Sequence, residues 1–443
     1  MPNVAFHTLG CKLNYAETSA LSQQFVDRGF NVVETEGADV FVLNTCTVTE
    51  NADREARQIV RRALRNAPDA VVIVTGCYAQ LQPEEIASIE GVDLVLGAAE
   101  KLRMFDFLSL PLQKNNVPHI ACAPIEEAEE FGAAFSAEGD SRTRAFLKVQ
   151  DGCDFNCSFC TIPLARGASR SQSIAATVEQ ASLLAIRGYK EIILTGVNVG
   201  DYGKKDGTDL LTLLRALETV NGIERIRISS IEPNLFTHEL LDYVAQSAKV
   251  CPHFHIPLQS GSDEILRQMR RRYDSTLYAE LIARIIEKIP DAGIGVDVIT
   301  GFPGETEDHF LETYSFLRDL PIAYLHVFTY SERENTPAAA MAKPVATAER
   351  KRRNEMLRTL SAKKRLAFNT RSIGETRKVL FEHEPKNGLA EGYTDNYVRV
   401  AAPFEPRLKN AIADVRLASV NEDGCMGEIV AVHEQQRATL QIL

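Results

Sequence analysis

The sequence predicts an α/β protein of three parts: an open parallel sheet, an incomplete parallel barrel and a small all-β barrel. Short apolar runs alternate with helical stretches over residues 1–112, and a second series of six such pairs begins at Arg142. From Ile373 onward, short strands are broken by Gly, Asn and Pro. Alternation of strand and helix is typical of parallel sheets, and closely spaced short strands indicate an all-β barrel. The expected division is a first domain at 1–112, a linker at 113–140, a barrel domain at 141–372 and a β-barrel domain at 373–443.

Composition limits the function classes. The chain has 443 residues, of which 45% are hydrophobic, so it can bury a full core. It contains no apolar run near the roughly 18 residues of a membrane span and no signal peptide pattern, which predicts a cytoplasmic protein without a membrane partner. Nine cysteines without an export signal argue against a disulfide framework and favour metal or redox chemistry. A net charge of −11 argues against wholesale coating of nucleic acid.

Cys11, Cys46 and Cys77 occupy equivalent places in the first part. Each ends a short apolar run, in VAFHTLGC, DVFVLNTC and AVVIVTGC, and is followed by a helical stretch at 14–30, 49–66 or 83–89. Ligands gather outside the carboxyl ends of parallel strands, and neighbouring strands lie only about 4.8 Å apart. We therefore expect the three thiols at one sheet edge. Three buried structural cysteines are the alternative, but the shared position favours an iron–sulfur cluster with one open iron.

Cys153, Cys157 and Cys160 form a C-x3-C-x2-C pattern in QDGCDFNCSFC. Structural zinc, the alternative, takes four ligands, often as two separated pairs. Three thiolates on one loop suit three irons of a [4Fe–4S] cluster, whereas ordinary clusters of this kind have four cysteines. The fourth iron would then be open to a substrate or cofactor. The remaining cysteines, Cys122, Cys251 and Cys425, are assigned no function.

The barrel strands place polar residues at one rim. The six expected strands are RAFLKV, KEIILTG, ERIRISS, HFHIPL, GIGVDVI and IAYLHVF, with helices at 175–187, 210–220, 276–288 and 307–317. The site of such a barrel lies at the carboxyl ends of its strands, and the cysteine loop follows the first strand. Each polar residue after a strand can be merely a turn residue, but together they predict a cofactor pocket. These candidates are Gly196, Val197, Asn198, Ser230, Glu232, Gln259, Ser260 and Gly301. His253 and His255 are expected in the core.

Residues 343–371 carry the chain's concentrated positive charge. Ten Lys or Arg against two Glu give this segment +8 in a protein of −11. A solvated helix face and a phosphate-binding surface both fit such a run. Tyr393 and Tyr397 in the last part can stack on bases or fill a core. The candidate RNA contacts are Arg350, Lys351, Arg352, Arg353, Tyr393 and Tyr397.

The two cysteine trios and the small β-barrel behind them resemble the methylthiotransferase branch of the radical S-adenosylmethionine (SAM) enzymes, over essentially the whole chain. The resemblance implies a flavodoxin-like N-terminal domain, a six-unit radical SAM partial TIM barrel and a C-terminal TRAM domain. TLGCKLN, NTCTVTENADREARQ and EGYTDNYVRV are similar to the MtaB type, which adds methylthio to C2 of N6-threonylcarbamoyladenosine at position 37 of tRNA. One departure is ARGASRSQS, where Ala168 and Gln172 replace two arginines of the usual pattern.

The resemblance also implies the cofactors and partners. Cys153, Cys157 and Cys160 would hold a [4Fe–4S] cluster that binds and cleaves SAM, shielded by Phe159. Cys11, Cys46 and Cys77 would hold a second [4Fe–4S] cluster that activates or supplies sulfur, with SAM as both methyl donor and radical source. The partners would be the tRNA anticodon loop and an electron donor such as a flavodoxin or ferredoxin.

Other functions stay open at this stage. The same chemistry can act on isopentenyladenosine in tRNA or on a ribosomal-protein aspartate. A contrasting class is a non-catalytic iron–sulfur RNA-binding protein. Against that class, an electron-transfer cluster has all four irons held by cysteine.

Overall fold

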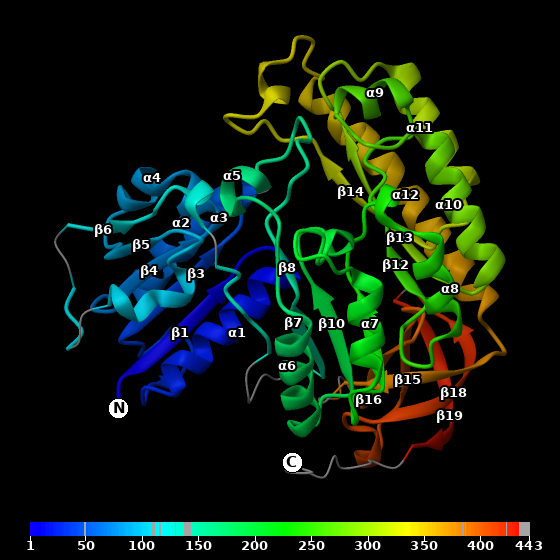
Figure 1. Ribbon diagram of the computed structural model, residues 1–443, viewed down its shortest axis with the longest axis horizontal. Coiled ribbons are helices and arrows are strands. Elements are labelled where there is room, and N and C mark those ends of the chain that lie inside the picture. Colours follow the sequence, from blue (N-terminus) through cyan, green and yellow to red (C-terminus); the bar gives the residue numbers. More distant parts are fainter. Residues whose placement is uncertain are drawn as a thin grey trace.

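A computed structural model describes residues 1–47, 50–108, 111–114, 117–128, 130–136, 143–382, 385, 387–421 and 423–433. Figure 1 shows the three expected parts: a parallel sheet with helices at the N-terminal end, a half-open ring of strands and helices in the centre, and a small β-barrel at the C-terminal end. The predicted fold class is therefore confirmed. None of the helices in the described ranges has the length and apolar character needed to cross a bilayer.

The first part is a six-stranded parallel sheet in the order β2-β1-β3-β4-β5-β6. Its strands are β1 (Asn3–Thr8), β2 (Asn31–Val32), β3 (Val40–Thr45), β4 (Val71–Gly76), β5 (Leu94–Leu96) and β6 (His119–Ala121). Its helices are α1 (Lys12–Val26), α2 (Glu50–Asn66), α3 (Cys77–Leu81), α4 (Pro83–Ala87) and the 3-10 helix η1 (Lys101–Asp106). The central strands β3 and β4 are buried on both faces, which explains their unbroken apolar sequences. β6 extends this sheet although its residues fall in the expected linker.

The second part is a parallel half-barrel of two three-stranded sheets, β11-β10-β7 and β12-β13-β14. Single bridges join them, from Ile226 of β11 to Val250 and from Ser230 to His255 of β12. Its strands are β7 (Arg144–Lys148), β10 (Glu191–Thr195), β11 (Arg225–Ile228), β12 (His253–His255), β13 (Gly293–Thr300) and β14 (Tyr324–Thr329). The helices are α5 (Ile162–Arg166), α6 (Ile174–Ile186), α7 (Leu210–Glu218), α8 (His238–Gln246), α9 (Asp263–Gln268), α10 (Ser275–Lys288), α11 (Glu307–Asp319) and α12 (Thr347–Arg371). A short antiparallel pair, β8 (Gln150–Asp151) and β9 (Arg170–Ser171), flanks the cysteine loop.

β14 is the last strand of the half-barrel, and its outer edge is paired with no other strand of the described chain. Helix α12 packs along it and reaches the C-terminal barrel. The barrel core lies between the strands and the outer helices, as alternation of strand and helix predicts.

The third part is a closed five-stranded barrel in the order β15-β16-β17-β19-β18. Its strands are β15 (Thr376–Phe381), β16 (Leu389–Thr394), β17 (Arg399–Pro403), β18 (Ile412–Val420) and β19 (Cys425–Val432). The ring of Tyr397 stacks on that of His253 with centroids 4.3 Å apart, so this barrel docks at the start of β12. The domain boundaries themselves stay a prediction.

The first part is fixed to the half-barrel by a buried ionic network centred on Glu17 of α1. Its carboxylate contacts Lys101 at the start of η1, Lys148 at 3.1 Å at the end of β7, and Arg166 at 2.9 Å at the end of α5. Asp151 of β8 shares Lys148 at 2.7 Å and Arg166 at 2.9 Å. The side chains of Glu17 and its three cations are at most 3% exposed.

Burial alone would raise the pKa of Glu17, but the charges of Arg166, Lys101 and Lys148 outweigh it and hold the pKa well below its usual value. In the same way, Lys148 and Arg166 overcome burial and lower the pKa of Asp151 to about 2. Both carboxyls are therefore ionised at neutral pH. Removing one member of such a buried ionic network strongly destabilises the fold, because a buried charge is left without its partner.

We predict that Glu17→Gln strongly destabilises the protein, because Lys101, Lys148 and Arg166 would stay buried around one remaining carboxylate. The free energy of unfolding, measured by chemical denaturation, should fall by about 3–5 kcal/mol. The matched control Glu36→Gln removes an exposed carboxyl and should cost less than about 0.5 kcal/mol. Equal losses in the two variants would contradict a structural role for the network.

The same comparison has a predicted pH dependence. Because the folded-state pKa of Glu17 lies below the unfolded one, its ionised form stabilises the fold. This contribution is complete above the ordinary glutamate pKa of about 4.3 and is lost as the pH falls below it. The stability difference between the wild type and Glu17→Gln should therefore shrink on acidification below about pH 4.

Candidate active site

Cys153, Cys157 and Cys160 lie on the loop between β8 and α5, beyond the carboxyl end of β7. The backbone N–H of Cys153 donates to the carbonyl of Gly167 at 3.0 Å, and that of Cys160 donates to Cys157 at 3.2 Å. Gly152 has φ +69°, and a Cβ there would lie 2.1 Å from the carbonyl oxygen of Ala168. Only glycine allows the loop to close against the Gly167–Ala168 backbone in this way. The structure thus brings the three predicted thiols onto one closed loop.

The burial of these thiols sets their chemistry. Burial, together with charge on the neighbouring cysteines, raises the pKa of Cys153 to about 11 and that of Cys160 to about 12. Burial also raises the pKa of Cys157, against the lowering effect of Arg271. Thiols in this setting become thiolates when a metal compensates their charge. Three such donors on one loop fit a [4Fe–4S] cluster, and their role as ligands stays a prediction.

Cys11, Cys46 and Cys77 meet at the carboxyl edge of the first sheet, as the strand-end pattern predicts. Cys11 precedes α1, Cys46 follows β3 and Cys77 begins α3. Gly10 has φ +102°, and a Cβ there would lie 2.6 Å from the Cβ of Cys46. Gly76 has φ +103°, and its Cβ would lie 2.4 Å from a backbone oxygen one residue before Cys46. The two glycines therefore let the loops that carry Cys11 and Cys77 close on the Cys46 loop.

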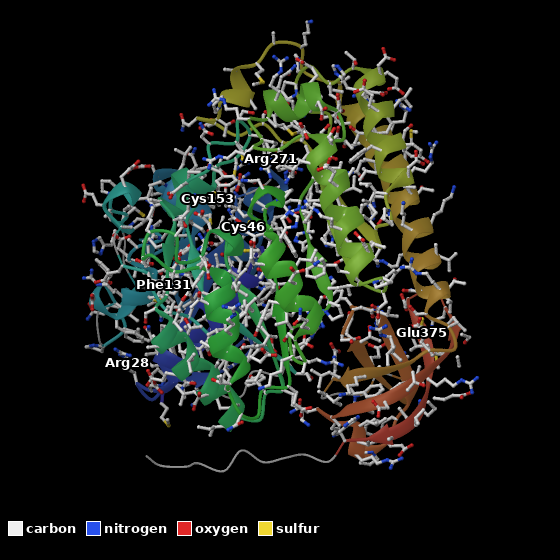
Figure 2. All side chains as sticks on the ribbon, turned by 45° about the vertical axis from the view of Figure 1, so that its right-hand side comes forward. Arg28, Cys46, Phe131, Cys153, Arg271 and Glu375 are labelled. Atoms are coloured by element: carbon white, nitrogen blue, oxygen red, sulfur yellow. The ribbon has the colours of Figure 1, made fainter. Side chains whose placement is uncertain are left out.

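The two trios lie on segments that pack against each other. Helix α3, which begins at Cys77, contacts α5, which begins two residues after Cys160. Thr47 and Thr161, the residues that follow Cys46 and Cys160, line one shared cavity of about 250 Å³. Cys46 and Cys153 both lie in the central region of the molecule in Figure 2. Arg166 of α5 also belongs to the Glu17 network, so this helix is tied to α1 as well.

A second cavity, of about 190 Å³, lies beside the cysteine loop of the half-barrel. Two predicted cofactor residues, Phe159 and Gln259, line it together with Cys160. Asp297 of β13 and Phe328 of β14 also line it, with other residues of these strands. This mixture of aromatic and a few polar groups is typical of small-molecule sites.

Asn198 and Gly196 lie after β10 at the same rim. Asn198 is buried, and both polar atoms of its side chain lack a hydrogen-bond partner in the described structure. Its backbone N–H donates to the side chain of Gln150 at 2.9 Å, and a Cβ at Gly196 would press on that same side chain. A buried amide without partners fits a polar ligand such as SAM. Val197 between them is half-buried.

The other predicted cofactor residues have protein partners. Ser230 Oγ lies 2.6 Å from His255 Nδ1, and Glu232 forms an ion pair with Arg271. Ser260 is fully buried and lies 3.1 Å from Thr313 of α11. Gly301 has φ +79°, and the side chain of Arg350 fills the space that a Cβ would take. Ser260 and Gly301 therefore lie in the packing behind the rim.

Sequence reasoning missed two site features. Arg271 joins the cysteine loop to Glu232, and its Nη1 lies 3.0 Å from Cys157 Sγ. It is one of several arginines in a row, so the sequence does not single it out as a site residue. His255, expected in the core, is half-buried and lies 2.6 Å from Asp297 Oδ1. His326 joins them, with one ligand atom of each residue within 4.8 Å of the others. Asp297 could have been recognised from the sequence, because it is the one acid within an otherwise apolar strand.

The expected phosphate contacts at Arg350 and Arg353 are wrong. Both side chains are buried: Arg350 pairs with Glu332, and Arg353 pairs with Glu305 at 2.7 Å. Arg352 is held by Glu307 at 2.6 Å and by Glu349. Lys351 is exposed and forms no ion pair with a described residue. The expectation failed because Glu305, Glu307 and Glu332 come from outside the basic segment.

Tyr393 and Tyr397 stack on each other with ring centroids 4.8 Å apart. Tyr397 also stacks on His253, and the guanidinium of Arg144 lies 4.5 Å from the ring centre of Tyr393. Both rings are half-buried between the two barrels. They lie at the junction of the barrels, where Tyr397 stacks on both His253 and Tyr393.

Comparisons with known proteins agree with this architecture. The model of the radical SAM superfamily matches residues 147–317, and that of the uncharacterized protein family UPF0004 matches residues 3–97. A solved structure of TsrM, a radical S-adenosylmethionine methyltransferase from Kitasatospora setae, has a TM-score of 0.55 at 16% identity. The likeness covers 76% of this chain and 75% of that one and shows a shared fold.

Curated relatives match nearly the full length. The threonylcarbamoyladenosine tRNA methylthiotransferase MtaB of Bacillus subtilis is 40% identical over 448 residues, covering 98% of each chain. Its namesake from Aquifex aeolicus is 42% identical, covering 88% of this chain and 95% of the relative. The tRNA-2-methylthio-N(6)-dimethylallyladenosine synthase of Akkermansia muciniphila is 31% identical, covering 94% and 96%. With its radical SAM barrel and its full-length likeness to these enzymes, the chain belongs to the radical SAM tRNA methylthiotransferase family.

Proposed function

We propose that this protein adds a methylthio group to C2 of N6-threonylcarbamoyladenosine at position 37 of tRNA. The observation that carries the proposal is that α3 and α5, the helices next to the two cysteine trios, pack against each other. Relatives that match the chain at 40% and 42% identity are named for this substrate. Relatives named for dimethylallyladenosine, such as that of Akkermansia muciniphila, are 31% identical, which favours threonylcarbamoyladenosine. A non-catalytic RNA-binding role leaves the cavity beside the cysteine loop unexplained.

Each trio would hold one [4Fe–4S] cluster. Bound there, the clusters and SAM supply the sulfur, the methyl group and the one-electron chemistry of the reaction. Phe159 and Gln259 line the cavity beside Cys160 and would bind SAM, with the unpartnered amide of Asn198 as a further contact. Arg271 fixes the loop that holds Cys157. An electron donor such as a flavodoxin or ferredoxin, and a cytoplasmic location with the tRNA, complete the proposal.

His255 and Asp297 would orient the target base. The carboxylate of Asp297 can only accept, so His255 Nε2 donates to it at 2.6 Å. In the neutral ring, Nδ1 then accepts from the hydroxyl of Ser230 at 2.6 Å. This chain of hydrogen bonds fixes the ring and keeps Asp297 at the cavity wall as an acceptor for an N–H of the base.

The substrate assignment predicts one nucleoside change in cells. Deleting the gene should leave N6-threonylcarbamoyladenosine in tRNA and remove its 2-methylthio derivative, as measured by nucleoside mass spectrometry. Complementation with the wild-type gene should restore the derivative, and complementation with Cys153→Ala should not. Loss of methylthio-isopentenyladenosine instead would contradict the substrate assignment.

The two-cluster assignment predicts the iron content. Anaerobically reconstituted protein should bind about eight irons, since each trio can hold one four-iron cluster. Replacing Cys153, Cys157 and Cys160 with Ala should halve the iron and abolish SAM cleavage. Replacing Cys11, Cys46 and Cys77 with Ala should also halve the iron but leave SAM cleavage detectable.

The control Cys122→Ala changes a half-buried thiol outside both trios and should keep the full iron content. Circular dichroism of the three variants checks that each is folded. Normal methylthio transfer by the variant without Cys11, Cys46 and Cys77 would overturn the role of the first trio.

A further inference from the structure

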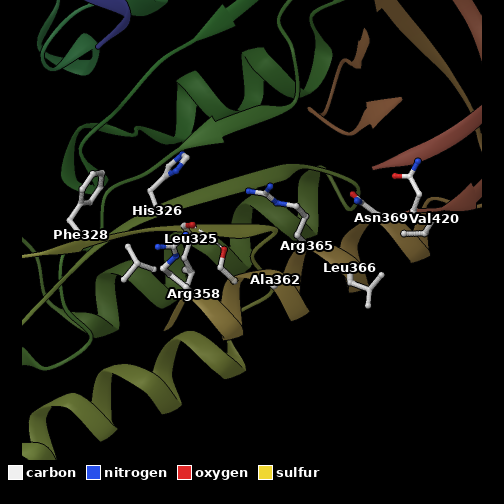
Figure 3. Close-up of a pocket in the computed structure, with 12 residues that line it drawn as sticks. Leu325, His326, Phe328, Arg358, Ala362, Arg365, Leu366, Asn369 and Val420 are labelled. Carbon is white, nitrogen blue, oxygen red and sulfur yellow. Dashed lines mark hydrogen bonds between the residues drawn. The ribbon is translucent and has the colours of Figure 1, made fainter. Parts of the chain in front are cut away.

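A groove of about 910 Å³ runs along the open edge of the half-barrel. It lies between β14, α12 and the end of β18, and so reaches from the half-barrel to the C-terminal barrel. Figure 3 shows His326 and Phe328 projecting from β14 and Arg365 extending from α12 toward the same space. The groove exists because β14 is the last strand of an unclosed barrel.

The groove is positively charged. Arg358 and Arg365 lie seven residues apart, two turns along one face of α12, and both are exposed. Neither forms an ion pair with a described residue, and the described residues that line the groove include no acid. Arg350 and Arg353, earlier on the same helix, are instead neutralised by glutamates. In a chain of −11, two unpaired arginines in one groove mark a place for an anion.

The groove leads to the candidate active site. Phe328 lines both the groove and the cavity beside Cys160. Its side chain is 44% exposed, and in the β13–β14 register it lies opposite Ile299, another residue of the cavity wall. His326, two residues earlier, lies opposite Asp297. A strand of substrate in the groove therefore passes directly beside the cavity.

We infer that this groove binds the single-stranded RNA next to the target base. Arg358 and Arg365 contact successive parts of the phosphate backbone, and a base stacks on Phe328 as the target nucleotide enters the cavity. Single-stranded RNA is bound in this way, by basic grooves with exposed aromatic rings, and a base must leave its stack for chemistry. The inference rests on the proposed function, because it takes tRNA as the substrate.

A peptide is the other polymer that the free edge of β14 can accept, by adding a strand to the sheet. The groove favours RNA, because its charged residues are both arginines and its exposed ring lies at the cavity mouth. A peptide strand needs only the backbone of β14, so it leaves the two arginines on α12 without a role. The experiment must therefore distinguish peptide binding from RNA binding.

The test is the salt dependence of binding to an anticodon stem-loop RNA, for holoenzyme carrying Arg358→Gln and Arg365→Gln together. The slope of log affinity against log salt should fall by about 1.4, since each lost phosphate contact on a single strand removes about 0.7. Affinity should fall about tenfold or more. SAM cleavage without RNA should stay at the wild-type rate, because neither arginine lines the cavity beside Cys160.

A matched control removes the same charge from the same helix. Lys351→Gln with Lys363→Gln changes two exposed lysines that do not line the groove, and it should leave the slope near the wild-type value. Phe328→Ala should weaken RNA binding by about 5- to 100-fold without changing the slope, because stacking releases no counterions.

The outcomes separate the inference from the function it rests on. A wild-type slope for the arginine double variant, or equal losses in the lysine control, would overturn the groove as the RNA site. The groove would also be overturned as the RNA site if a ribosomal-protein peptide displaced the RNA and bound the groove variants as tightly as it binds the wild type. If the groove variants lose RNA binding but the wild-type enzyme leaves threonylcarbamoyladenosine unmodified, the proposed function fails and the groove stands.

Discussion

The carboxylate of Glu17 is the constraint on which the rest of the structure depends. It receives cations from η1, β7 and α5, so one side chain joins the first sheet to the half-barrel. Apolar contact alone is non-directional and allows packed surfaces to shift. Buried charges with several hydrogen bonds permit one arrangement, because any displacement leaves a charge without its partner. This arrangement places the segments of the two cysteine trios against each other, because Arg166 ends helix α5, which packs on α3.

Local backbone constraints then place the thiols within that frame. Gly10, Gly76 and Gly152 each have a positive φ, and a side chain at any of them would collide with a neighbouring segment. They allow the loops that carry the cysteines to close tightly, and Cys46, Cys77 and Cys157 are buried there. Burial makes the free thiolate unfavourable in the half-barrel loop, so metal binding and completion of that loop are expected to be coupled.

The sequence predicts what depends on short-range pattern. Each strand-end cysteine of the first sheet follows its own apolar run, so parallel pairing alone brings Cys11, Cys46 and Cys77 to one edge. The C-x3-C-x2-C loop is defined within eight residues. Gln259 and Phe159 meet at the cavity for a similar reason, because both follow strands of one half-barrel. These features need no knowledge of side-chain packing.

What the sequence cannot predict depends on partners far along the chain. In the sequence, Arg350 looks like a surface cation. In the fold its side chain pairs with Glu332 and packs against Gly301. Arg358 and Arg365 have the same local sequence character but line a groove whose described residues include no acid. The difference lies in tertiary neighbours, which a charge count over one segment does not contain. Tyr397 is likewise of a residue type that often stacks on bases, but in the fold its ring stacks on His253 at the junction of the two barrels.

The central claim is that one buried network holds two cluster sites on facing segments of a single chain. Diffraction from anaerobic crystals of reconstituted protein, measured at the iron absorption edge, tests it most directly. The account predicts two anomalous peaks, one within the loop of Cys153, Cys157 and Cys160 and one beside Cys11, Cys46 and Cys77, on either side of the contact between α3 and α5. A single peak, or a second peak away from the first trio, would contradict it.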